Sequence, residues 1–166
     1  YFNLRNHRKI MVIDGRVGFT GGMNIGEHHW LSLAPKEPTL DCHFRLTGPI
    51  VGQLQEVFAE DWAFSCGELL QGDAWFPALE PTGHAYCRGI VDGPDILSDP
   101  MHTVFLLALA QARRSVKIVS PYFLPDSRLS SALRVAAMRG VAVDVLVPRQ
   151  TDSRVVDAAA RANSIP

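Results

Sequence analysis

The pattern of apolar and polar positions near the start of the chain predicts a β-hairpin. Residues 10–13 and 17–20 are β-rich runs, and the dipeptide Asp14-Gly15 between them tolerates the positive φ of a two-residue hairpin turn. Alternation along each run gives the hairpin one face suited to a core. The residues suited to that face are Ile10, Val12 and Val17 or Phe19.

The next stretch predicts a strand followed by a long helix. Residues 41–46 form the strand, and Gly48-Pro49 opens a helix that continues to about residue 64, because proline suits the first helical turn. Side chains near one face of this helix form an aromatic stripe, which we expect to be core and not a lipid contact. The stripe contains Leu54, Val57, Phe58, Asp61 and Trp62.

The remainder of the chain alternates strands with helices. Residues 67–82 lose periodicity and gather glycine, proline and acidic residues, as a linker or crossover does. The alternation beyond them favours an α/β fold with a parallel or mixed β-sheet flanked by helices. The predicted strands are 86–91, 116–120 and 141–147, and the predicted helices are 101–114, 126–139 and one that begins at Asp152 or Ser153.

Composition narrows the class of protein. Of 166 residues, 47% are hydrophobic and 20% charged, which suits a soluble globular unit of one or two lobes. The net charge of −1 gives no electrostatic footprint for nucleic acid. Three cysteines, in neither a CxxC pair nor an even set, indicate a reduced compartment. No apolar run approaches the ~20 residues of a membrane-spanning helix, and the chain shows no secretory signal.

The candidate chemistry lies on the predicted hairpin. Side chains alternate along a strand, so His7 and Lys9 are expected to share one face. The second strand leads to Gly21-Gly22, where two glycines allow close backbone approach to a ligand. Asn24 follows, and its amide can donate to a phosphate oxygen.

These residue types suit attack on a phosphodiester. One imidazole can attack phosphorus while another protonates the leaving alcohol, because an ordinary histidine titrates near neutral pH. Lys9 would stabilise charge on the non-bridging oxygens. The attacking imidazole also needs a partner on its second nitrogen. The basic residues Arg5, Arg8 and Arg16 cluster around this region, which suits a small anionic headgroup better than a long polyanion.

The spacing His-x-Lys-x4-Asp-x6-Gly-Gly-x-Asn, from His7 through Asp14 to Asn24, resembles the HKD motif of the phospholipase D superfamily. Other stretches resemble bacterial cardiolipin synthases, and the similarity covers most of the chain, departing mainly at 31–39 and near 71–83. These stretches are 3–9, 18–26, 56–62, 120–126, 146–149 and 151–154. The resemblance implies phospholipase D-like lobes. The implied parts are the end of lobe one in 1–66, a crossover in 67–83 and the start of lobe two in 84–166.

The resemblance also implies residue roles. His7 matches the motif histidine, which forms or assists a phosphohistidine intermediate, and Lys9 and Asn24 match the phosphate-binding pair. Asp14 matches the motif aspartate, whose role is more structural than chemical. Asp41 aligns with an acidic residue that supports the catalytic imidazole. The implied substrate-binding residues are Gly21, Gly22, Arg5 and His43.

Simpler explanations stay open for several of these residues. Asp41 is alternatively an ordinary aspartate at a strand start, and His43 a satisfied histidine beneath the site. The sequence His28-His29-Trp30 suggests metal binding at first sight. Adjacent histidines on an extended chain point to opposite faces, however, so we expect a loop or helix end there and no metal. The superfamily chemistry requires no cofactor.

The function implied by the resemblance is transfer of phosphatidyl from one phosphatidylglycerol to another, giving cardiolipin and glycerol. The superfamily pairs two HKD histidines across a pseudo-twofold interface, and this sequence shows one. We therefore expect an internal piece, inactive alone, whose second motif and membrane helices lie outside it. The expected partners are anionic phospholipid and the membrane, without nucleic acid, at the cytoplasmic face of a bacterial inner membrane.

Three other functions stay open. The first is a phospholipase D that hydrolyses phospholipid, and the second is a nuclease of the same superfamily. The third is a non-enzymatic lobe that only binds anionic lipid.

Overall fold

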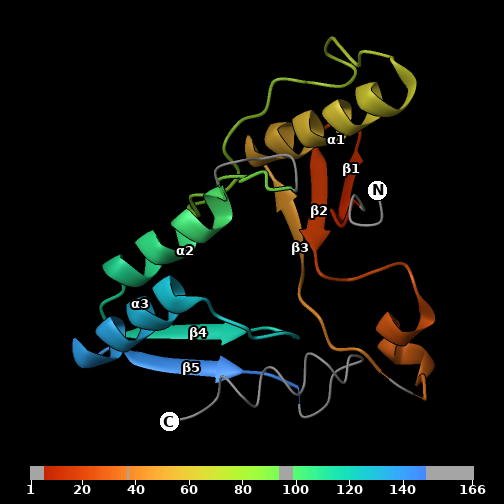
Figure 1. Ribbon diagram of the computed structural model, residues 1–166. Coiled ribbons are helices and arrows are strands. Elements are labelled where there is room, and N and C mark those ends of the chain that lie inside the picture. Colours follow the sequence, from red (N-terminus) through yellow and green to blue (C-terminus); the bar gives the residue numbers. More distant parts are fainter. Residues whose placement is uncertain (1–5, 37, 94–98, 149–166) are drawn as a thin grey trace. The chain divides into compact units, whose positions relative to one another are not determined.

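The computed structural model describes residues 6–36, 38–93 and 99–148 (Figure 1). The chain divides between Asp95 and Ile96 into two compact units. One unit contains a three-stranded antiparallel sheet and the other a two-stranded parallel sheet. The predicted α/β class is thus confirmed, with one antiparallel sheet and one parallel sheet where a parallel or mixed sheet was predicted.

The first unit is built on the predicted hairpin. Strands β1 (Ile10–Ile13), β2 (Val17–Gly21) and β3 (His43–Thr47) lie in the order β1-β2-β3. Asp14 and Gly15 both have positive φ, 53° and 63°, as the turn prediction requires. The loop is one residue longer than predicted: Ile13 pairs with Val17, and the N–H of Arg16 donates to the carbonyl of Ile13 at 3.0 Å.

Helix α1 (Ile50–Cys66) packs on one face of this sheet. Val51 is fully buried and Leu54 nearly so. A Cβ built on Gly18 of β2 would lie 2.7 Å from Cδ1 of Leu54, so the absence of a side chain lets α1 approach the sheet.

The aromatic stripe of α1 is only partly core, which corrects the sequence prediction. Leu54 belongs to the core, but Phe58 and Trp62 are 38% and 40% exposed. Their rings stack on each other with centroids 6.0 Å apart, and the indole N–H of Trp62 donates to Glu68 at 2.9 Å. These rings therefore pack on each other at the surface of α1. The contact with the sheet is made by smaller side chains.

The predicted strand at 86–91 is wrong. Those residues form no ladder, and Tyr86 is fully exposed. The segment instead lies against α1, where the N–H of Gly89 donates to Oε1 of Gln53 at 2.7 Å. The division between the two compact units falls after residue 95, and the predicted lobe boundaries at 66 and 84 stay a prediction.

Gly15 meets a second constraint besides its positive φ. A Cβ there would lie 2.5 Å from Cδ of Pro77 and 2.7 Å from the carbonyl oxygen of Trp75. We expect Gly15→Ala to lower the free energy of unfolding by about 1–3 kcal/mol, measured by urea denaturation. The control is Gly52→Ala on α1, where no heavy atom lies within 4 Å. It should raise stability by up to ~1 kcal/mol through helix propensity, and equal losses in the two variants would contradict the argument.

The second unit follows the predicted helix–strand–helix–strand order. Helix α2 (Pro100–Gln111), strand β4 (Ser115–Val119), helix α3 (Ser127–Met138) and strand β5 (Ala142–Leu146) are present, with β4 and β5 parallel. Helix α2 ends at Gln111, three residues before the predicted residue 114. The Arg139 guanidinium donates to carbonyls of its last turn, those of Ala110 and Leu109. The helix predicted to begin at Asp152 or Ser153 lies outside the described residues.

Asp126 caps helix α3. Its Oδ1 accepts the backbone N–H of Leu129 at 2.8 Å, and its other carboxylate oxygen lies 3.3 Å from Nε of Arg128. The hydrogen bond from the Leu129 N–H has the largest effect and lowers the pKa of Asp126 below its ordinary value of 3.8. Burial has a smaller, opposing effect, and Arg128 and His102 lower the pKa further. The ionised carboxylate of Asp126 therefore stabilises the folded state at neutral pH, and this stabilisation is lost as the pH falls through the lowered pKa.

Between pH 7 and acid pH, we expect the free energy of unfolding to fall less in Asp126→Asn than in the unmodified chain. The reason is that asparagine caps the helix without titrating. Urea denaturation across that pH range measures the difference. Asp73→Asn, at an exposed position, is the control. An identical acid dependence in Asp126→Asn and the unmodified chain would contradict this assignment.

Candidate active site

The sheet register brings several candidate residues to one end of the three strands. Gly21 pairs with His43, and Ile10 pairs with Thr20, so continuing the ladder by one residue sets Lys9 opposite Gly21. Directly opposite residues point to the same side of an antiparallel sheet. Gly18 lies on the side that contacts α1, so by alternation Lys9, Gly21 and His43 lie on the other side.

Asp14 lies at the opposite end of the hairpin. It occupies the turn beyond Ile13, and the four residues of β1 separate it from Lys9. At ~3.3 Å per residue the two are more than about 13 Å apart along the strand. The structure therefore does not bring Asp14 to the other candidates, and its implied role, more structural than chemical, stays a prediction.

The two glycines at the end of β2, Gly21 and Gly22, are required by the protein itself. The N–H of Gly22 donates to the carbonyl of Cys42 at 3.0 Å. A Cβ on Gly21 would lie 2.6 Å from Cα of His43, and one on Gly22 would clash with both carboxylate oxygens of Asp41. The close backbone approach predicted for a ligand is thus made by residues 41–43, and contact of these glycines with a ligand stays a prediction.

Asp41 and His43 lie beside this glycine pair. Oδ1 of Asp41 accepts the N–H of Cys42 at 2.7 Å, and Nδ1 of His43 is buried without a hydrogen-bond partner among the described residues. Within the same described part of the chain, no hydrogen bond joins Asp41 to His7. The support of the catalytic imidazole by Asp41 and the substrate contact of His43 both stay predictions.

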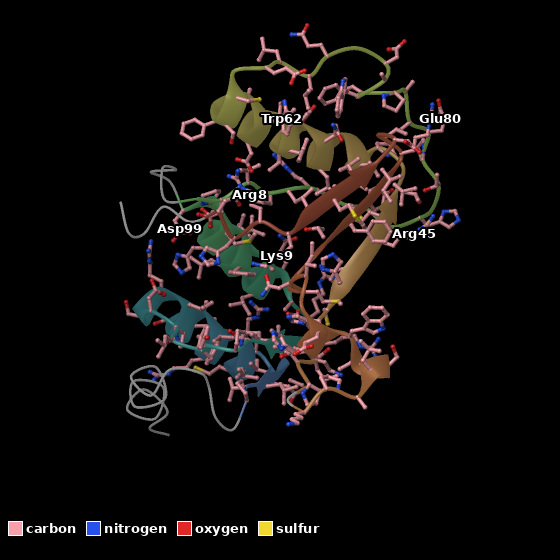
Figure 2. All side chains as sticks on the ribbon, turned by 90° about the vertical axis from the view of Figure 1, so that its right-hand side faces the viewer. Arg8, Lys9, Arg45, Trp62, Glu80 and Asp99 are labelled. Atoms are coloured by element: carbon pink, nitrogen blue, oxygen red, sulfur yellow. The ribbon has the colours of Figure 1, made fainter. Side chains whose placement is uncertain are left out.

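A cluster that the sequence did not reveal holds the segment carrying His7 (Figure 2). The Arg8 guanidinium lies 2.7 Å from Oδ1 of Asp61 on α1, and the Asn6 amide donates to Oδ2 of the same carboxylate at 2.7 Å. The backbone N–H of Arg8 donates to Oδ1 of Asn6 at 2.8 Å. The two residues flanking His7 are therefore tied to one carboxylate of the helix.

A signal for this cluster was present in the sequence. Asp61 falls within the aromatic stripe of α1, and a carboxylate on a helix face expected to be buried needs a charged or hydrogen-bonding partner. Arg8 was predicted only as one of the basic residues that cluster around the candidate site. Figure 2 shows Arg8 on the side of α1 and Lys9 farther from that helix, as strand alternation requires.

Lys9 is oriented by the segment it belongs to. Its Nζ donates to the backbone carbonyl of His7 at 2.8 Å. An ammonium has three donors, so this bond leaves donors for a phosphate oxygen next to His7. Asn24 is exposed in the loop that leaves the same end of the sheet, and Arg5 lies outside the described residues.

The described residues contain neither a cluster of metal ligands nor a membrane-spanning helix. Residues 6–36, 38–93 and 99–148 contain no group of three or more His, Cys, Asp or Glu side chains placed to hold a metal ion. No helix within these ranges has the length and apolar character needed to cross a membrane.

Comparisons with known proteins bear on both units. A family model described as cardiolipin synthase, PLD-like domain, matches residues 105–164. Cardiolipin synthase A of Pseudomonas putida (strain GB-1) is 42% identical over 160 residues, which are 95% of this chain. The chain is similar to phospholipase D-like cardiolipin synthases over nearly all of its length. The HKD resemblance predicted from the sequence is thus confirmed.

Other relatives show the same sequence identity, and the chain spans the same share of each. Cardiolipin synthase A of Pseudomonas fluorescens (strain SBW25) and that of Pseudomonas entomophila (strain L48) are also 42% identical over 160 residues. The chain spans 32% of the length of these curated relatives. The family model covers residues of the second unit, whereas the His7 segment lies in the first.

Proposed function

We propose that this chain supplies one half of a phosphatidyl-transfer site that joins two phosphatidylglycerol molecules into cardiolipin and releases glycerol. The observation that carries the proposal is the end of the β1-β2-β3 sheet. There Lys9, the glycine pair and residues 41–43 come together beside a His7 segment anchored on α1. Similarity to cardiolipin synthases supports the substrate class.

In this proposal the transfer runs in two displacement steps. A histidine nitrogen forms a bond to phosphorus while the bond from phosphorus to the glycerol oxygen breaks, and a second histidine gives that oxygen its proton. The hydroxyl of a second phosphatidylglycerol then loses its proton to this second histidine and attacks phosphorus, and the phosphorus–nitrogen bond breaks. His7 is one of the two histidines, and the other comes from a second HKD motif.

The neighbouring residues have separate tasks. Lys9 and Asn24 bind the non-bridging oxygens, where negative charge grows in the transition state. Asp41 orients the imidazole from the side of the glycine pair. Residues 1–66 are the end of lobe one, 67–83 a crossover and 84–166 the start of lobe two. The complete enzyme acts at the cytoplasmic face of a bacterial inner membrane, where its phospholipid substrates lie.

A hybrid enzyme tests the proposal. The 160-residue region of this chain replaces its counterpart in Pseudomonas putida cardiolipin synthase A. We expect the hybrid to convert phosphatidylglycerol into cardiolipin and glycerol, and the isolated chain to give no product. Comparable yields from both would overturn the half-site proposal. Phosphatidic acid in place of cardiolipin would indicate hydrolysis, and DNA cleavage without lipid turnover would indicate a nuclease.

A further inference from the structure

An exposed apolar patch lies on the loop between β2 and β3, next to the proposed half-site. We define the patch by five side chains that are 47% to 110% exposed. They are Ile25, Trp30, Leu31, Leu33 and Leu40. Single exposed apolar residues are common on soluble proteins, but a group of this size on one loop marks an interaction surface.

The loop holds these side chains outward in a defined backbone conformation. Residues Glu27–His29 and Leu31–Leu33 form two short 3-10 helices. The N–H of Leu33 donates to the carbonyl of Trp30 at 3.0 Å, and that of Thr39 to the carbonyl of His28 at 2.9 Å. Backbone groups of the two short helices are thus paired within the loop, while the apolar side chains of the patch are exposed. Such an arrangement suits burial of the loop in an apolar medium, where an unpaired backbone group would cost free energy.

The position of the loop indicates what that medium is. Figure 1 shows the loop leaving the end of β2 and returning to the start of β3, the end of the sheet that gathers the site residues. Asn24 and Asp41 are its first and last neighbours in sequence. A phospholipid headgroup bound at this end keeps its acyl chains in the bilayer, so the site must lie at the bilayer surface.

The charge of the loop distinguishes electrostatic attraction to a bilayer from binding through apolar side chains. Residues 25–40 contain one lysine and two glutamates, a formal charge of 1 − 2 = −1 with histidine neutral. This charge does not attract an anionic surface. Tryptophan and leucine side chains, by contrast, bind the interfacial region through buried apolar area.

We propose that the patch Ile25, Trp30, Leu31, Leu33 and Leu40 inserts into the interfacial layer of a phospholipid bilayer and holds the half-site at its surface. The inference rests on the proposed function for its choice of bilayer as occupant. It adds a contact that depends on apolar area and not on headgroup charge. Binding should therefore be similar on neutral and anionic vesicles and should persist at about 0.5 M salt, where surface electrostatics are screened.

Vesicle binding by the 166-residue chain tests this directly. We compare the unmodified chain with the triple variant Trp30→Ser, Leu31→Ser and Leu33→Ser on vesicles of phosphatidylcholine alone and of phosphatidylcholine with phosphatidylglycerol. The triple variant should bind both at least ~10-fold more weakly, because three partly buried apolar side chains are lost. The control Phe64→Ser with Leu69→Ser, at 95% and 71% exposed positions outside the loop, should bind as the unmodified chain does.

Fluorescence gives a second measurement that leaves the loop intact. The chain has three tryptophans, so Trp62→Phe with Trp75→Phe leaves Trp30 as the one reporter. Its emission should shift to the blue on vesicles and be quenched by lipids brominated on the acyl chains.

Several results would overturn the proposal. One is unchanged binding by the triple variant, and another is Trp30 emission unaffected by vesicles. A third is binding confined to phosphatidylglycerol vesicles and abolished by salt. A fourth is loop-dependent self-association in sedimentation without vesicle binding, which would assign the patch to a protein contact. Because these readouts involve no turnover, their failure is separate from a failure of the hybrid to make cardiolipin.

Discussion

Replacing His7 with alanine in the hybrid enzyme is expected to lower kcat/KM for cardiolipin formation by at least ~10³-fold. The change removes either the group that attacks phosphorus or the acid that protonates the leaving glycerol, and either loss leaves no route of comparable rate. Initial rates of cardiolipin release from phosphatidylglycerol vesicles measure the effect.

Two controls separate chemistry from folding and binding. His84→Ala changes an exposed histidine outside the site and should keep full activity. Binding of phosphatidylglycerol vesicles should be largely unchanged in His7→Ala, because the imidazole acts in the reaction and not in docking. Retention of more than about a tenth of the activity in His7→Ala would contradict the role of His7.

Replacing Arg8 with alanine is expected to lower the free energy of unfolding by about 2–3 kcal/mol. The guanidinium bonds both the Asp61 carboxylate, at 2.7 Å, and the carbonyl of Asp92, at 3.4 Å. Its loss leaves the half-buried Asp61 with the Asn6 amide as its remaining side-chain donor. Urea denaturation of Arg8→Ala, Asp61→Asn and the double variant forms a cycle whose coupling should be about 1 kcal/mol, as for a partly screened pair.

The same variant separates positioning from stability. In the hybrid, Arg8→Ala should lower kcat with little change in KM, because it loosens the segment that carries His7 and does not touch the lipid. Arg88→Ala, an exposed arginine of the same unit, serves as the matched control for both measurements. An additive double variant, or a loss of activity confined to KM, would show that Arg8 and Asp61 do not act together on His7.

Local sequence was sufficient for most elements of the fold. Asp14-Gly15 specified the turn because few other dipeptides adopt two successive positive φ angles, and the periodicity of α1 and α3 specified those helices. The strand at 86–91 was wrong because alternation shows that a segment can be a strand and not whether a neighbouring strand is available. That segment found a helix surface instead, through Gly89 and Gln53.

The candidate residues were identified from the sequence, whereas their contacts are visible only in the folded structure. Strand alternation explains why Arg8 and Lys9 point to opposite sides, but the partner of Arg8 lies 53 residues away and no local pattern connects the two. The glycine pair was expected to face a ligand, and it accommodates Asp41 and His43. Such contacts depend on how β3 returns beside β2 after the intervening loop, which is a property of the folded sheet.

The most direct test of the half-site is to trap the covalent intermediate in the hybrid enzyme. Hybrid and phosphatidylglycerol are mixed, quenched in alkali, which preserves phosphohistidine, and digested for mass spectrometry. We predict a phosphatidyl or phosphoryl adduct on one of the two HKD histidines in the unmodified hybrid, and its loss in His7→Ala. An adduct of equal yield in His7→Ala would contradict the account, because the reaction would then proceed without this half of the site.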